Sequence, residues 1–162
     1  MTLRRVDSDT VALGPLDPFA INLLRQIGGC ARDDDPAARA RLFPSPTNGT
    51  EGQLDRDWKS YVEPDLRRIF QSSLEVIEED LEGRVSGSSS KGRTLQIPVA
   101  HLDAWIHGLN QARLAIVARQ NFSSAELEGD MPLDGNERAL ALFQTHFYGF
   151  LQECFLRELG DA

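Results

Sequence analysis

The stretch from Pro98 to Asn121 constrains the fold most strongly, because it reads as one long helix with a single apolar side. At about 100° per residue, the apolar side chains on that side are Leu102, Trp105, Ile106, Leu109, Ala112 and Ile116. Pro98 suits the first helical turn, where its missing N–H is not needed. The sequence therefore predicts a central helix over residues 98–121 that buries this side against the rest of the chain.

A cation lies within this apolar side. Arg113 is about 20° from Leu102 on the helical wheel, and Asn110 lies at the edge of the stripe. A guanidinium there must reach water or bind an acceptor, because an unpaired charge is costly to bury. One interpretation is a notch between two helices in which Arg113 and Asn110, with His107 beside them, bind an anionic small molecule or a carboxylate.

The alternative interpretation is a clamp inside the protein. Glu158 falls on the apolar side of the last helix, so its carboxylate is a candidate partner for Arg113. Carboxylates near Asp17 and Glu63 are further candidates. Structural ion pairs are commoner than binding sites, so the sequence favours the clamp and leaves the notch open.

The whole chain, residues 1–162, predicts a single domain of mainly α structure. Two short strand-like segments within residues 1–14 flank a polar triplet and predict a β-hairpin. The segment TLQI at residues 94–97 is also strand-like and is able to join the hairpin as a third short strand. An isolated hairpin is marginal in water, so this small sheet must pack against the helices.

Helical spacing of the other apolar residues predicts a bundle of four to five helices. A last helix over residues 134–159 is expected to form the core pair with the central one. Pro64 lacks a backbone donor, so the sequence predicts that the helix kinks or restarts there. The polar stretches at residues 84–92 and 123–133 predict loops, the first of them flexible.

The last helix carries a broad aromatic face. The residues predicted to lie in the core or at an interface are Trp105, Leu109, Phe143, Phe147, Phe150 and Cys154. Most of this apolar load must be buried. Any surplus predicts contact between two copies of the chain, because monomeric proteins rarely leave a large apolar patch in water.

Composition narrows the classes of partner. The formal net charge is −8 and the pI about 4.8, so the chain repels phosphate backbones and no nucleic-acid partner is expected. No stretch reads as a membrane span or an export signal, and the two cysteines do not make a disulfide framework. The sequence therefore predicts a cytoplasmic protein that does not bind membranes.

Candidate catalytic and metal-binding patterns are weak. Asp103 and His107 share a helix face, but two ligands are too few for a metal site. A row of acidic residues reads as a solvated helix face: Glu75, Glu78, Glu79 and Glu82. The sequence predicts no catalytic residue, no metal and no cofactor, and it favours a protein that is not an enzyme.

One signature in the central helix resembles a known family. The pattern Trp105-x3-Leu109-Asn110-x2-Arg113-Leu114, preceded by the RLFP turn at residues 41–44, is similar to an uncharacterised bacterial family described only as a domain of unknown function. The resemblance covers most of the chain. Members are often encoded beside the Clp protease adaptor in actinobacteria, which implies a link to regulated proteolysis. An acidic residue commonly follows the asparagine in that family, whereas this chain has Gln111.

Two classes of function follow. The favoured one is a non-enzymatic cytoplasmic interaction or regulatory module with a protein partner, for which a second copy of the chain is a candidate. The competing class is a small-molecule binder or enzyme that uses the notch around Arg113 and Asn110.

Overall fold

The computed structural model describes residues 1–88, 92–129 and 135–160. The elements, in chain order, are β1 (Thr2–Arg5), β2 (Thr10–Leu16), α1 (Pro18–Arg25), α2 (Ile27–Cys30), α3 (Pro36–Leu42), α4 (Gly52–Asp57), the π-helical turn η1 (Trp58–Val62), α5 (Glu63–Gly83), β3 (Val85–Ser88), β4 (Gly92–Pro98), the 3-10 turn η2 (Val99–His101), α6 (Leu102–Gln120), α7 (Ser124–Glu128) and α8 (Glu137–Gly160). The mainly α prediction is confirmed, although the helices are more numerous than the four to five expected.

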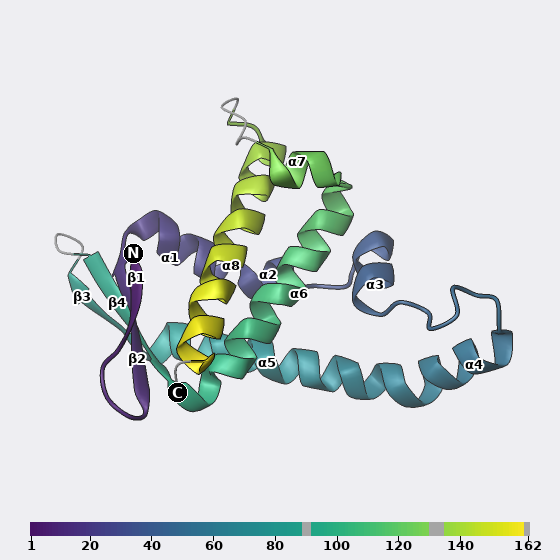
Figure 1. Cartoon of the computed structure of the whole chain (residues 1–162), viewed down its shortest axis with the longest axis horizontal. Helices are drawn as coiled ribbons and strands as arrows, with labels where there is room; N and C mark the ends of the chain where they lie inside the picture. The colour runs from purple at the N-terminus through teal and green to yellow at the C-terminus, as the bar shows by residue number, and fades with distance from the viewer. Residues whose placement is uncertain (89–91, 130–134, 161–162) are drawn as a thin grey trace.

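The predicted core pair is present. Helices α6 and α8 run side by side, joined at one end through α7, and α5 crosses beneath them (Figure 1). Trp105 and Leu109 of α6 are completely buried, as are Tyr148 and Phe155 of α8. The rings of Trp105 and Phe155 are 5.7 Å apart, so these two helices share one aromatic core.

A close crossing of α5 and α6 depends on a glycine. A Cβ atom added to Gly108 of α6 would lie 2.3 Å from Ile77 Cδ1 of α5. Glycine in a helix interior is unfavourable by roughly 0.5–1 kcal/mol relative to alanine. The close approach of Ile77 explains why this position has no side chain.

The sheet has four strands in the order β1-β2-β4-β3, all antiparallel. The predicted N-terminal hairpin and its third strand are both confirmed, because β4 pairs with β2 in a register that places Val11 opposite Ile97. The loop predicted at residues 84–92 is wrong over Val85–Ser88, which form β3 and extend the sheet. Residues 89–91 lie outside the described part of the chain.

Several predicted boundaries move. Pro98 ends β4 with extended backbone, and α6 begins only at Leu102. Asn121 ends α6 in the left-handed conformation (φ 49°) that asparagine tolerates better than most residues. Within the loop predicted at 123–133, residues 124–128 form α7 instead, and residues 130–133 are outside the described part.

Helices α4, η1 and α5 form one continuous rod that extends away from the sheet (Figure 1). Of the kink or restart predicted at Pro64, the structure shows a restart: the π turn Trp58–Val62 ends directly before α5, and Pro64 lies in the first turn of α5, where proline is tolerated. Leu54 and Tyr61 are exposed along this rod, to 48% and 76%.

Candidate functional site

Arg113 is the centre of the candidate site. It is half-buried on α6, and its Nη1 donates a hydrogen bond of 2.7 Å to Oε1 of Gln152 on α8. Gln152 in turn donates through Nε2 to the backbone carbonyl of Ile106. The partner of the guanidinium is therefore a neutral amide that is itself held in place by α6.

Gly149 of α8 makes room for this guanidinium. A Cβ atom at Gly149 would lie 3.2 Å from Arg113 Cζ and 3.3 Å from both Nε and Nη2. The guanidinium therefore lies against the backbone of α8. A glycine in the middle of a 24-residue helix is unfavourable in itself, and here it permits the close approach of Arg113.

One edge of the guanidinium has no acceptor. Within the described residues Nη1 alone has a hydrogen bond, and Nε is buried without a partner. Nε and Nη2 form the side edge of an arginine, which makes two parallel hydrogen bonds to a carboxylate or phosphate. Arg113 therefore keeps its bidentate edge unused.

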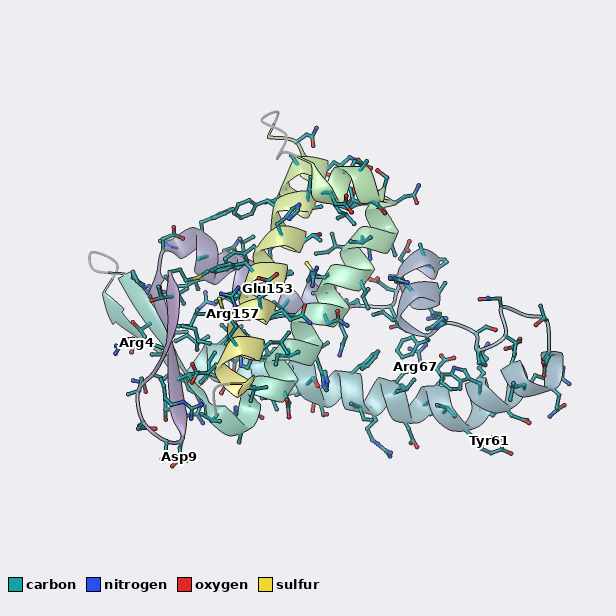
Figure 2. All side chains as sticks on the ribbon, viewed as in Figure 1. Arg4, Asp9, Tyr61, Arg67, Glu153 and Arg157 are labelled. Atoms are coloured by element: carbon teal, nitrogen blue, oxygen red, sulfur yellow. The ribbon has the colours of Figure 1, made fainter. Side chains whose placement is uncertain are left out.

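A cavity of about 440 Å³ lies beside Arg113, between α3, α6, α7 and α8. Its polar and charged lining residues are Arg41, Asn110, Arg113, Thr145, His146 and Glu153. Glu153 is exposed and lies 3.4 Å from Arg157, so its charge is partly compensated outside the cavity. The two arginines give the lining a positive balance even with His146 neutral. Figure 2 shows Glu153 and Arg157 on α8.

The structure brings together part of the site predicted from the sequence. Asn110 and Arg113 both line the cavity, whereas His107 is exposed and is not among the lining residues. The predicted clamp by Glu158 is wrong, because Glu158 pairs with Arg5 of β1 at 2.6 Å. The two alternative carboxylates also have other partners. Asp17 caps α1 by accepting a hydrogen bond from Ala20 N–H, and Glu63 forms an ion pair with Arg67.

The comparison with family models decides the identity of the chain. A model described as a domain of unknown function, DUF2017, matches residues 2–159. The chain belongs to the DUF2017 family. No curated protein and no solved structure matches it. The resemblance inferred from the sequence is confirmed at this level, while the bacterial source and the neighbouring Clp adaptor gene stay predictions.

The DUF2017 domain exposes much of the aromatic face that the sequence assigned to core or interface. Phe143 and Phe150 of α8 are 37% and 49% exposed, and Phe147 and Cys154 are half-buried. Partial burial raises the pKa of the Cys154 thiol. The ring of Phe143 is 5.7 Å from that of Phe19 on α1, which is 51% exposed. We call the row formed by Phe19, Phe143, Phe147 and Phe150, of which Phe147 is half-buried, the aromatic stripe.

Sequence reasoning missed a buried acid in the DUF2017 domain. Asp80 on α5 is 0% exposed. It accepts a hydrogen bond from Trp105 Nε1 at 2.9 Å and forms an ion pair with Arg84 Nε at 2.9 Å, while His101 Nδ1 lies 3.0 Å from both carboxylate oxygens. The spacing of Ser73, Ile77 and Asp80 places Asp80 on the buried face and was the available signal. The four glutamates expected to be solvated are indeed exposed.

Other groups of ionisable residues in the DUF2017 domain give no metal-binding arrangement. Within residues 1–88, 92–129 and 135–160, no three side chains among histidine, cysteine, aspartate and glutamate are placed to hold a metal ion. Across the same ranges, no helix has the length and apolarity needed to cross a membrane.

Proposed function

We propose that this domain is a non-enzymatic recognition module whose ligand-binding site is the cavity between α6 and α8. The ligand presents a carboxylate or phosphate group to the unused edge of Arg113. One observation carries the proposal: Nε of Arg113 is buried without a partner while the residue borders a cavity of about 440 Å³. That volume is within the usual range for sites that hold small molecules or side chains.

The other lining residues support an anion rather than a neutral ligand. Arg41 adds a second positive charge from α3, and Asn110 adds amide N–H donors from α6, whereas the hydroxyl of Thr145 already donates to the carbonyl of Ala141. An acceptor that reaches the Nε–Nη2 edge of Arg113 relieves the desolvation of a buried donor, which is worth about 1–3 kcal/mol. A neutral ligand leaves the guanidinium of Arg113 without an anionic partner, because Gln152 is uncharged.

Isothermal titration calorimetry with succinate, inorganic phosphate and an N-acetylated aspartyl peptide tests this proposal. The first two probes represent a free anion, and the peptide represents an acidic side chain of a protein partner. We expect saturable binding by at least one probe and at least roughly tenfold weaker binding by Arg113→Met, because a charged hydrogen-bonding group is lost.

The matched control is Arg4→Met, which removes the same charge from the exposed edge of the sheet (Figure 2). This variant is expected to bind as the native chain does. Equal binding by Arg113→Met and the native chain, or no binding of any probe, contradicts the proposal.

A second candidate function, association with another copy of the chain, is favoured by the aromatic stripe. Its rings lie on neighbouring turns of α8 and continue onto Phe19 of α1. Light scattering of the native chain at high concentration is expected to give a dimer that Phe150→Ser disrupts and Leu54→Ser, at a comparably exposed residue of α4, retains. A strict monomer contradicts this second proposal. The link to Clp-type proteolysis is tested separately by copurification with the adaptor.

A further inference from the structure

A second cavity, of about 270 Å³, lies where α5 and α6 meet the end of α3 and the segment after α2. Gln111 of α6 lines it. Gln111 and Arg113 are two positions apart, which is about 200° around a helix. The second cavity therefore lies on the side of α6 away from Arg113, and the two cavities share no lining residue.

Gln111 is a buried donor without an acceptor. Its side chain is 3% exposed, and Nε2 has no hydrogen-bond partner within the described residues. The buried amide of Gln144 is different, because its Nε2 donates to Oε1 of Gln26. An unsatisfied buried amide destabilises a protein, so such groups are uncommon and need an explanation.

The walls of this cavity are largely apolar. The rings of Phe43 and Phe70 are 5.4 Å apart, and further apolar side chains come from Ala31, Leu42 and Leu74. A largely apolar cavity with an unsatisfied polar side chain in its lining has the usual composition of a site for a small organic ligand.

Two of the three charged residues in the lining, Asp33 and Arg67, are paired, and the third, Arg32, is exposed to solvent. Arg67 forms ion pairs with Asp33 and Glu63, and its Cζ lies 4.2 Å from the centre of the Phe43 ring. Burial would raise the pKa of Asp33, but its hydrogen bond to Arg67 and the charge of that residue outweigh this effect and lower the pKa. Asp33 and Arg67 neutralise each other and Arg32 is solvated, so the lining has no buried charge that needs an ionic ligand.

We propose that this cavity binds a small uncharged compound that carries a carbonyl oxygen. The oxygen accepts a hydrogen bond from Nε2 of Gln111, and the apolar body of the compound packs against Phe43 and Phe70. The site is separate from the anion site at Arg113 in both position and ligand chemistry, so either proposal stands or falls without the other.

Benzamide is the probe, because it joins an aromatic ring to a carbonyl acceptor. In an NMR titration of the full chain, we expect saturable shifts of the Gln111 side-chain amide resonances. Gln111→Met keeps the length of the side chain and removes the donor, and it is expected to bind benzamide roughly tenfold more weakly. Arg113→Met is expected to bind benzamide as the native chain does.

Toluene provides the matched probe, because it has the ring and lacks the acceptor. It is expected to bind the native chain and Gln111→Met alike, which shows that the variant retains a folded cavity. The proposal is overturned if benzamide gives no saturable shift, if Gln111→Met binds it unchanged, or if Nε2 contacts an ordered water only and keeps that contact when benzamide is added.

Discussion

Asp80 of α5 and Arg113 of α6 carry opposite charges, and they differ in how fully the protein satisfies them with hydrogen bonds and ion pairs. Asp80 is 0% exposed, and donors from Trp105, Arg84 and His101 surround its carboxylate. Arg113 is half-buried and has one neutral partner, Gln152, together with an open cavity at its side. The carboxylate of Asp80 is therefore neutralised and hydrogen-bonded within the protein. The guanidinium of Arg113 keeps N–H donors that no described residue accepts.

The difference separates a structural charge from one available to a ligand. A buried carboxylate with several donors joins α5, η2 and α6, and removing it leaves those donors without an acceptor. A guanidinium with unused donors adds little to stability, yet it is already oriented for an incoming anion. Burial alone does not distinguish the two roles; the number of satisfied hydrogen bonds does.

The largest expected effect is that of Asp80→Ala. Loss of the carboxylate leaves the indole N–H of Trp105 buried without an acceptor and releases Arg84 and His101. We expect a loss of about 3–5 kcal/mol in the free energy of unfolding, the usual result of removing one partner from a buried charged network. Urea denaturation followed by circular dichroism measures this change.

Glu79→Ala is the matched control, because Glu79 is the neighbouring acid on α5 and is exposed. Its effect is expected to stay within about 0.5 kcal/mol. If Asp80→Ala is no more destabilising than this control, Asp80 is not a charge on which the stability of the fold depends.

The sequence predicted the position of Arg113 but not the residue that binds it. The position of Arg113 in the apolar stripe of α6 follows from local periodicity, which is readable along the chain. Its partner was not predictable by the same means, because Glu158 and Gln152 both lie on α8 and only tertiary packing decides which one meets the guanidinium. Glu158 is taken by Arg5, a residue more than 150 positions away.

Other misses have equally physical causes. The strand at Val85–Ser88 has a glycine- and serine-rich sequence with little β propensity, and pairing with β4 outweighs that preference. Asp80 lies within an acidic run, so its charge suggested solvent although its spacing from Ile77 indicated the core. The need for a glycine at position 149 could not be predicted, because it depends on Arg113, which faces it from α6.

A smaller effect is expected from two glycine substitutions that separate packing from ligand binding. Gly108→Ala places a methyl group 2.3 Å from the buried Ile77 Cδ1 and is expected to destabilise the fold by about 1–3 kcal/mol, as overpacked cores do. The atoms nearest to a Cβ at Gly149 belong to the guanidinium of Arg113, a flexible group that can move. The unfolding free energy of Gly149→Ala is expected to change by less than about 1 kcal/mol, because the gain in helix propensity offsets the contact.

The same pair gives opposite results when anion binding is measured by calorimetry. Gly149→Ala displaces the guanidinium and is expected to weaken binding, although the fold stays intact. Gly108→Ala is expected to leave the affinity of the folded protein unchanged, because Gly108 does not line the cavity. If Gly149→Ala is the more destabilising variant, then Arg113 is part of the structural core.

A small effect on stability is expected from Arg113→Met. Methionine keeps the apolar stem against α8 and removes the charge, and Gln152 retains its hydrogen bond to the carbonyl of Ile106. The loss is therefore close to that of one hydrogen bond to a half-exposed group, less than about 1 kcal/mol. Thermal and urea unfolding measure it beside Asp80→Ala. A loss as large as that of Asp80→Ala makes Arg113 an internal clamp, because only a charge on which the fold itself depends is so costly to remove. A near-neutral result, together with lost anion binding, assigns the guanidinium to a ligand.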